Sequence, residues 1–212
     1  MKVEVWSDFA CPFCYIGKRR LEAALERFPH RDEVEVVYHS FELDPAAEKN
    51  TDFDIHTMLA RKYGMSREQA KQMNDNVAQQ AKSVGLTYNM DTIVPTNTFD
   101  AHRLAQYAAD HGKGVEMTER LLKAYFTDTV NLSDREVLAD LAVEVGFERE
   151  TVVALLDGDE YTNKVRSDEQ EASALGIRGV PFFVLDRKYG VSGAQQTEVF
   201  TQALEKAWSE RA

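Results

Sequence analysis

The sequence predicts an α/β fold with the order βαβ, then an all-helical insertion, then αββα. Apolar residues alternate along two short segments near the N-terminus and along a hairpin near the C-terminus, as they do in half-buried strands. From about Asp44 to Gly158 the apolar period is helical throughout. We therefore predict one discontinuous α/β domain, residues 1–43 and 159–212, and an inserted helical domain, residues 44–158.

The N-terminal βαβ unit begins with a strand in which Val3 and Val5 alternate with charged residues. A helix is predicted over Cys11–Phe28, because its apolar residues recur at helical spacing: Leu21, Ala24, Leu25 and Phe28. A second strand follows, with one face made of Val34, Val36 and Tyr38. Two strands joined by a crossover helix are typical of parallel pairing.

The insertion shows several helix signals. Ser66 and Gln69 have the spacing of a capping box, and the helix that follows keeps an apolar face up to Gly85, made of Ala70, Met73, Val77, Ala81 and Val84. Thr98 is predicted to cap a helix that reaches Asp110. A further helix carries Met117, Leu121 and Tyr125, and a second capping box is predicted at Ser133–Glu136, ahead of a helix that stops at Gly146.

The C-terminal αββα part begins with a helix over about Glu160–Leu175, stopped by Gly176. Residues 179–193 read as a β-hairpin with Pro181 at its first edge, where a missing backbone N–H is tolerated. A final helix closes the chain, and its apolar face consists of Phe200, Ala203, Leu204 and Trp208.

Composition limits the class of function. The 212 residues are 43% hydrophobic and 29% charged, with a net charge of −11, which argues against nucleic-acid binding. No segment approaches the roughly 18 apolar residues of a membrane span. The N-terminus has no apolar signal-peptide core, so we expect a cytoplasmic protein, although a removed leader would leave no trace.

Both cysteines stand in the segment SDFACPFCYIGKRR, residues 7–20. With Cys11 near the N-cap of the predicted helix, Pro12 occupies the first helical position, where its missing N–H costs nothing. The positive end of the helix stabilises a thiolate, and Cys14 lies one turn deeper, within reach for a disulfide. The spacing predicts a redox pair, with Cys11 as the exposed nucleophile and Cys14 as the resolving thiol.

Two other interpretations of the pair remain open. Structural zinc usually needs four ligands, and the five histidines are scattered without ligand spacing to the cysteines. The cysteines can also be two inert buried residues. Pro181, taken by composition alone, is a trans proline at a strand edge.

Several segments resemble a known family: SDFACPFCYIGKRRLE, NTFDAHRL, VSGAQ and the GVPFF stretch before the hairpin. Over nearly the whole chain the sequence resembles the thioredoxin superfamily, in particular the DsbA-like branch with its helical insertion and its FrnE-like subfamily. The resemblance implies a thioredoxin-like fold and thiol–disulfide oxidoreductase activity. It also implies a cis Val180–Pro181 bond beside the cysteines, with the Val180 backbone offered to an extended substrate.

One departure concerns the dipeptide between the cysteines. It is Pro-Phe here, whereas the strongly oxidising relatives carry Pro-His, so we expect a weaker oxidant. Kappa-class glutathione transferases and 2-hydroxychromene-2-carboxylate isomerases share the fold and resemble NTFDAHR, but they generally use a serine at the nucleophile position. A glutathione-dependent isomerase or transferase is therefore one alternative function, and a non-catalytic binding or chaperone module is another.

The remaining candidate residues surround the motif. Phe9, Pro12, Phe13 and the Val180–Pro181 pair are expected to frame a substrate groove. Asn97, His102 and Arg103 either face the active site or simply begin and pack a helix. Lys18 either touches the buried thiol or is a surface lysine, and Trp6 and Phe9 are otherwise core residues.

The expected chemistry defines the partners. We expect no metal and no tightly bound cofactor, since exchange between thiols and disulfides requires neither. Glutathione or a thioredoxin-type reductant would reset the couple. The substrates would be proteins or small molecules that carry thiols or disulfides, while nucleic-acid and membrane partners are not expected.

Overall fold

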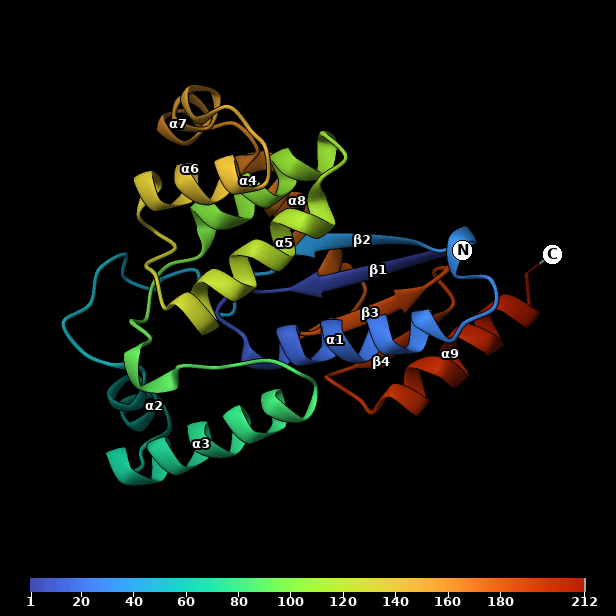
Figure 1. Cartoon of the computed structure of the whole chain (residues 1–212), viewed down its shortest axis with the longest axis horizontal. Helices are drawn as coiled ribbons and strands as arrows, with labels where there is room; N and C mark the ends of the chain where they lie inside the picture. The colour runs from blue at the N-terminus through green and yellow to red at the C-terminus, as the bar shows by residue number, and fades with distance from the viewer. Residues whose placement is uncertain (212) are drawn as a thin grey trace.

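The computed structural model describes residues 1–211. Its four-stranded sheet has the order β2-β1-β3-β4 (Figure 1). β1 is parallel to β2 and antiparallel to β3, and β3 pairs antiparallel with β4. The predicted βαβ unit and C-terminal hairpin are confirmed. The strands are β1 Lys2–Ser7, β2 Glu35–Ser40, β3 Phe182–Leu185 and β4 Tyr189–Ser192.

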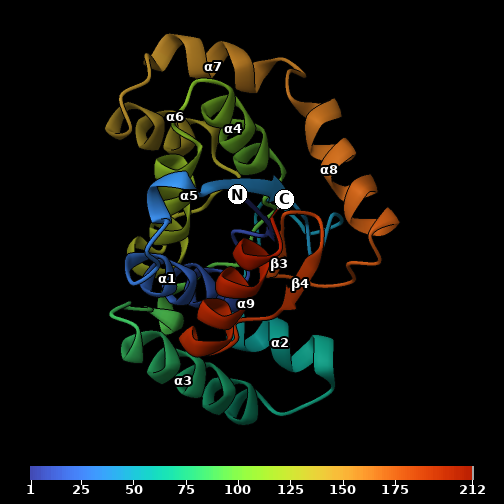
Figure 2. The same ribbon diagram turned by 90° about the vertical axis from the view of Figure 1, so that its right-hand side faces the viewer.

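Helices cover both faces of the sheet (Figure 2). On one face lie α1 (Pro12–Glu26) and α9 (Thr197–Ser209), and on the other lies α8 (Thr162–Ala174). Val3 and Val5 pack toward α1 and α9, while Trp6 packs toward α8, as the alternation along a strand requires. Because Trp6 pairs with Phe182, Pro181 lies at the end of β1 from which the chain enters α1.

The helical segment between β2 and α8 packs around this layer (Figure 1). One large hydrophobic core joins Phe9, Tyr15 and Ile16 to the buried residues of these helices. The division into two domains stays a prediction, because this core spans both parts. The helices are α2 Ile55–Tyr63, α3 Arg67–Ser83, α4 Phe99–Asp110, α5 Gly114–Lys123, α6 Arg135–Glu144 and α7 Arg149–Asp157.

Two of the predicted caps need correction. The Ser66 capping box is confirmed, with both reciprocal hydrogen bonds present. At α6, however, the N-cap is Asp134, whose carboxylate accepts from the Glu136 and Val137 amides. Ser133 lies one residue too early, and its hydroxyl donates to the carbonyl of Lys49 instead.

Thr98 precedes α4 but does not cap it with its side chain. Its hydroxyl donates to the Asp8 carboxylate. The amide of Phe99 donates instead to the side-chain oxygen of Asn97, at 2.9 Å. The residue predicted as a cap therefore connects α4 to the segment that carries the cysteines.

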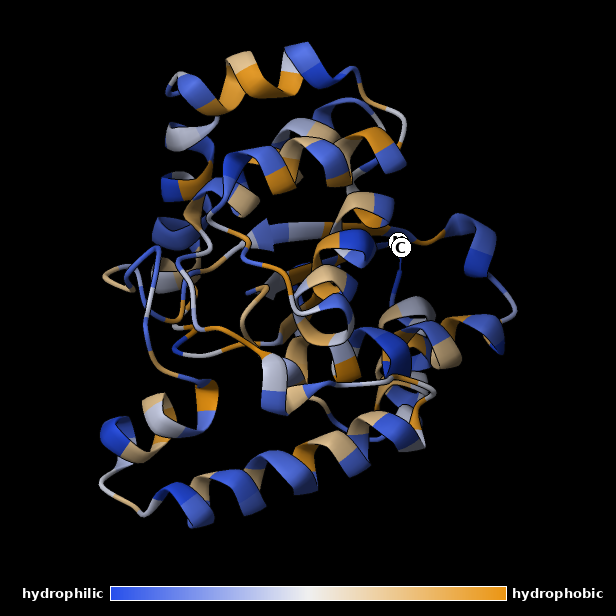
Figure 3. Ribbon diagram, turned by 60° about the vertical axis from the view of Figure 1, so that its left-hand side comes forward, coloured by the Kyte–Doolittle hydropathy of each residue, from blue (hydrophilic) through white to orange (hydrophobic). Residues whose placement is uncertain are grey.

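α3 buries only a narrow stripe, and most of its ribbon is hydrophilic (Figure 3). Ala70 and Ala81 are buried as predicted, but Met73 is 44% exposed. The predicted apolar face is wrong at Met73, because this side chain lines a cavity instead of the core. No helix within residues 1–211 is both long and apolar enough to cross a membrane.

Candidate active site

The two cysteines lie at the beginning of α1. Cys11 is the N-cap residue, with extended backbone angles, and Pro12 is at the first helical position, as predicted. The amide of Cys14 donates to the Cys11 carbonyl at 3.0 Å, which fixes the turn between them. Both thiols are free, and the geometry places Cys14 one turn into the helix.

The expectation that Cys11 is exposed is wrong. Only 3% of its surface is accessible, because the loop before β3 covers the start of α1 and the Val180 carbonyl lies 3.5 Å from the Cys11 sulfur. Cys11 nevertheless lines a cavity, so a substrate that enters the cavity reaches this residue.

This cavity, which we call the Cys11 cavity, has a volume of about 550 Å³. Three of the predicted groove residues, Pro12, Phe13 and Val180, line it together with Cys11. Phe13 is 40% exposed at its rim. The loop after β2 and the helices α2 and α3 supply most of the apolar wall, with Leu43, Ile55, Met58, Leu59, Met73 and Val77.

The Val180–Pro181 peptide is cis, as the resemblance implied. α1 approaches this strand closely at Gly17, where an added Cβ would stand 3.1 Å from the ring of Pro181. Pro181 is therefore packed against the helix that carries both cysteines, while Val180 faces Cys11.

Cys14 is held in a buried polar setting. Its sulfur accepts a hydrogen bond from the Asp8 amide at 3.4 Å. Burial raises the pKa of Cys14 well above its usual value, and the neighbouring Cys11 raises it further. Cys14 is therefore protonated at neutral pH, which suits a thiol that reacts second.

Asp8 is a functional candidate that we did not predict. It is 2% exposed, and its carboxylate accepts from the Thr98 hydroxyl, the Leu43 amide and His102 at 2.8, 2.8 and 3.3 Å. Burial alone would raise its pKa, but these hydrogen bonds outweigh burial and lower the pKa of Asp8. Its partners come from segments far apart in the sequence, so no local pattern signals them.

The three candidates near α4 have different surroundings. His102 contacts Asp8 and packs against Phe9, with ring centroids 4.7 Å apart, but it does not line the Cys11 cavity. Asn97 donates to the Ala47 carbonyl at 3.2 Å, which holds the loop that forms one wall of that cavity. Arg103 does not contact the cysteines; its guanidinium donates to backbone carbonyls at the end of α7.

The aromatic residues beside the motif belong to the core. Trp6 is fully buried, stacks on His39 and donates to the Asp168 carbonyl at 3.0 Å. Phe9 is buried in the large core and lies on no wall of the Cys11 cavity. Phe9 therefore packs in the core behind the cavity. The prediction that it frames the groove is wrong.

Neither interpretation of Lys18 matches its position. Its side chain is 3% exposed, and its ammonium lies 2.5 Å from Glu22 and 2.6 Å from Glu119 on α5. The face of α1 that carries Lys18 is covered by α5, which supplies the opposite charge. Lys18 is therefore a buried ion-paired residue, neither a surface lysine nor a contact of the thiol.

Among residues 1–211, no group of side chains placed to share a metal ion lies at the cysteines. Within residues 1–211, the side chains placed to share a metal ion are His39, Asp168 and Glu171, and this group includes neither cysteine. Both ring nitrogens of His39 already contact carboxylates, Asp168 at 2.9 Å and Glu4 at 3.2 Å. The zinc alternative therefore finds no support in the geometry.

Comparison with known proteins agrees with this geometry. The chain is 50% identical to the protein named "probable DsbA oxidoreductase" from Streptomyces coelicolor, with a TM-score of 0.95 over 100% of this chain and 92% of that one. A 2-hydroxychromene-2-carboxylate isomerase (14% identity, TM-score 0.75, coverage 99% and 97%) shares the fold. So does the cytosolic disulfide reductase DsbM of Pseudomonas aeruginosa (16%, 0.68, 100% of both).

A family model supplies the remaining evidence. The DSBA-like thioredoxin domain matches residues 2–205, which include both cysteines, the helical segment and the C-terminal hairpin. The predicted thioredoxin-like α/β fold is confirmed. Because the match extends over nearly the whole chain, the protein belongs to the DSBA-like thioredoxin domain family.

Proposed function

We propose that the protein is a thiol–disulfide oxidoreductase that acts through Cys11 and Cys14 and exchanges disulfides with protein or small-molecule substrates. One observation carries the proposal: Cys11 is the N-cap residue of α1 and lines an open cavity, with Cys14 one turn deeper. Membership in an oxidoreductase family supports it. The FrnE-like subfamily stays a prediction.

The proposed cycle has two exchanges. The Cys11 thiolate attacks a substrate disulfide, which forms a mixed disulfide and releases one substrate thiolate. Cys14 then loses its proton and attacks the Cys11 sulfur, which forms the Cys11–Cys14 disulfide and releases the second substrate thiolate. The substrate is reduced by two electrons and the protein is oxidised by two, and the reverse sequence oxidises a dithiol.

The substrate would lie across the Cys11 cavity. Pro12, Phe13 and Val180 surround the sulfur there, and the wall is largely apolar, which favours substrates with an apolar group next to the reacting sulfur. The Val180 backbone would hydrogen-bond an extended substrate beside Pro181.

The couple must be reset by another thiol. Glutathione or a thioredoxin-type reductant serves this role in our proposal, with no tightly bound cofactor. We also propose a cytoplasmic location, in which a close cysteine pair is more often catalytic than structural. The DsbM protein with the same fold is named as cytosolic.

Phe13 is the reason why we expect a lower reduction potential than in the Pro-His relatives. It supplies no cation beside the Cys11 thiolate, and each 1.4 kcal/mol of extra stabilisation of the reduced form raises the potential by about 30 mV. We therefore expect a weaker oxidant than the relatives with Pro-His between their cysteines.

Insulin reduction and reactivation of scrambled ribonuclease test the proposal with the wild type, Cys11→Ser, Cys14→Ser and the double variant. We expect loss of both activities in Cys11→Ser and a stalled mixed disulfide in Cys14→Ser. Retained activity in Cys14→Ser that disappears without glutathione would indicate the isomerase or transferase alternative. Full function of the double variant would indicate a binding or chaperone module.

A further inference from the structure

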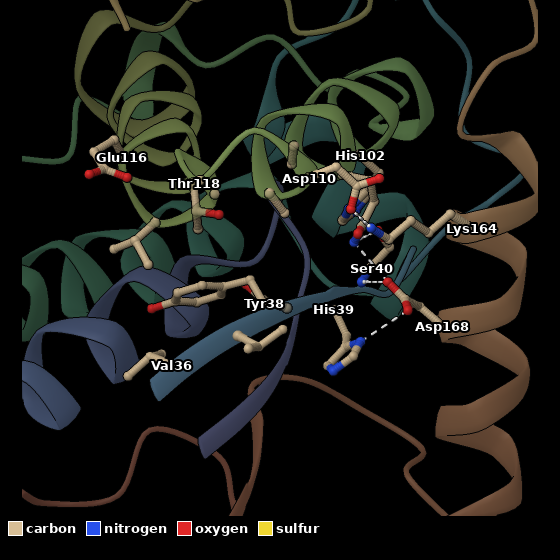
Figure 4. Close-up of a pocket in the computed structure, with 18 of the residues that line it drawn as sticks. Val36, Tyr38, His39, Ser40, His102, Asp110, Glu116, Thr118, Lys164 and Asp168 are labelled. Carbon is tan, nitrogen blue, oxygen red and sulfur yellow. Dashed lines mark hydrogen bonds and ion pairs between the residues drawn. The ribbon is translucent and has the colours of Figure 1, made fainter. Parts of the chain in front are cut away.

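A second cavity lies along β2 and reaches the buried end of β1 (Figure 4). We call it the β2 cavity; its volume is about 530 Å³, and its walls are β2, α4, α5 and α8. None of the residues that line it also lines the Cys11 cavity. Its lining includes Ser7, the last residue of β1, together with the buried polar residues Ser40, His102, Gln106 and Thr118.

Ser7 and Ser40 are paired in register across the parallel strands β1 and β2, yet their hydroxyls differ in hydrogen bonding. The Ser40 hydroxyl accepts from Gln106 at 3.0 Å. The Ser7 hydroxyl is buried and finds no partner among the residues that the structure describes. A buried hydroxyl without a partner is costly, and a polar cavity of this size has room for a water that would bond it.

Ser7 is also next to the resolving cysteine. Asp8, the following residue, donates its amide to the Cys14 sulfur. The alternation along β1 places Ser7 with Val3 and Val5 on the sheet face that α1 covers. Burial and the neighbouring Cys11 raise the pKa of Cys14, and the Ser7 hydroxyl, which lies close to the sulfur without a well-aligned hydrogen bond, lowers it.

We propose that Ser7 is a positioning residue for the second exchange, holding a water of the β2 cavity beside Cys14 so that its proton leaves by this route. The inference rests on the proposed function. It assigns separate routes to the two reactants: the substrate reaches Cys11 from one cavity, and the proton of Cys14 leaves through the other.

Cys14 gives its proton to the water held by Ser7, and the proton passes to solvent along the β2 cavity. The Cys14 sulfur forms a bond to the Cys11 sulfur, and the bond between Cys11 and the substrate sulfur breaks. The substrate leaves as a thiolate, so one proton and one thiolate are released for each disulfide formed.

Stopped-flow reaction with DTNB separates the two exchanges. Attack by Cys11 releases the first thionitrobenzoate at a rate proportional to DTNB concentration, and attack by Cys14 releases the second at a rate independent of it. In Ser7→Ala we expect an unchanged first phase and a second phase about ten times slower near pH 7. This loss is smaller than the roughly 10²–10⁴-fold loss expected for a residue that transfers the proton itself, because Ser7 only positions the water. The difference should shrink as the pH rises, because hydroxide then removes the proton directly.

Two variants control for structure. Ser7→Thr keeps the hydroxyl and should restore the wild-type pH profile of the second phase. Ser40→Ala removes the hydroxyl that faces Ser7 in the same cavity and should leave both phases unchanged. A second phase of Ser7→Ala that equals the wild type, or that is slower by the same factor at every pH, would overturn the role of Ser7.

The wild type gives an independent measurement that does not depend on a variant folding. Proton transfer through the cavity predicts a larger solvent deuterium isotope effect on the second phase than on the first. Equal isotope effects would contradict the proposal. If the wild type releases only one equivalent, the proposed function itself fails, which is a different outcome from a normal second phase in Ser7→Ala.

Discussion

Asp8 shows how one buried carboxylate fixes the segment that carries both cysteines. Its oxygens bond Thr98 at the start of α4 and Leu43 after β2, while its amide bonds the sulfur of Cys14. Three parts of the chain therefore meet at a single residue, three positions before Cys11.

We predict that Asp8→Asn lowers the free energy of unfolding by about 1–3 kcal/mol at neutral pH, because buried donors lose their acceptor. The lowered pKa of Asp8 means that its contribution is present above its unfolded pKa, near 3.9, and is lost as the pH falls through the folded pKa. As the pH falls below about 4, the free energy of unfolding should therefore decrease less in Asp8→Asn than in the wild type.

Urea unfolding between pH 7 and pH 3 measures both effects. Asp52→Asn is the matched control, since Asp52 is exposed and should behave like the wild type. An Asp8→Asn variant as stable as the wild type, with the same acid sensitivity, would contradict this account of Asp8.

Residues that belong to one local pattern can be predicted from the sequence, whereas residues that are brought together by tertiary contacts cannot. Cys11, Pro12 and Cys14 follow from their spacing, and the site of Pro181 followed only from the family resemblance. Asp8 and Thr98 meet across 90 positions, and no period in the sequence connects them. For the same reason Lys18 was misplaced: its partner Glu119 lies on a distant helix.

At the scale of elements, the contact of α1 with the strand after Pro181 depends on Gly17. A Cβ at this position would stand 3.1 Å from both Phe183 and Pro181. We predict that Gly17→Ala lowers the stability by about 1 kcal/mol, since overpacking costs about 1–3 kcal/mol and the better helix propensity of alanine returns at most about 1.

The same substitution should slow insulin reduction, because α1 carries the cysteines past this contact. Thermal unfolding and the reduction rate are measured together, with Ala23→Gly as a reverse control on a half-buried position of the same helix. A Gly17→Ala variant that is more stable and equally active would show that the close approach has no consequence.

A second link between elements joins α1 to α5 through Glu119. Burial opposes its ionisation, but hydrogen bonds from Arg19, Lys18 and Tyr15 lower the pKa of Glu119 to about 2. Its contribution to stability is therefore present above the ordinary pKa near 4.3 and is lost as the pH falls toward about 2.

Glu119→Gln should lower stability by about 1–2 kcal/mol at neutral pH, a discounted value because Glu119 is 31% exposed. Asp75→Asn, which breaks the exposed Lys71 pair on α3, should cost about 0–0.5 kcal/mol. Chemical denaturation compares the two, and an equal cost would contradict the importance of the buried lysine.

The elements themselves were well predicted where apolar period and end signals agreed. The four strands and the helices from α3 to α6 were expected, as were α8 and α9. α2 and α7 are not predicted, because each has only nine residues and the apolar residues of α7 form one continuous run, Val152–Leu156, in which no helical period is visible. The sequence predicts Met73 in the core because periodicity does not distinguish a core position from a cavity wall.

At the scale of the whole molecule, the net charge of −11 affects which disulfides approach quickly. We predict that cystamine, a cation, reacts with Cys11 several times faster than the anion oxidised glutathione at low salt. The difference should shrink as added salt screens the charge. Stopped-flow rates at increasing salt test this, with neutral hydroxyethyl disulfide as the reference; an unchanged ratio would rule out a charge effect.

One cavity of the molecule is lined by Cys11, and another is lined by Ser7, four positions before Cys11 in the chain. Helices from residues 44–158 supply much of the wall of both, so the helical segment does more than cover the sheet. The sequence indicated that this segment exists and is helical. Its contribution to the cavities depends on packing between distant helices, which local patterns do not encode.

The central claim is that Cys11 and Cys14 form a reversible disulfide, and equilibration with glutathione buffers followed by mass spectrometry tests it most directly. We predict loss of two hydrogens in the wild type, no such loss in Cys11→Ser, and a midpoint more reducing than about −120 mV, the value of the strongly oxidising DsbA. A wild type that accumulates only glutathione adducts, or that keeps both thiols in every buffer, would contradict the account.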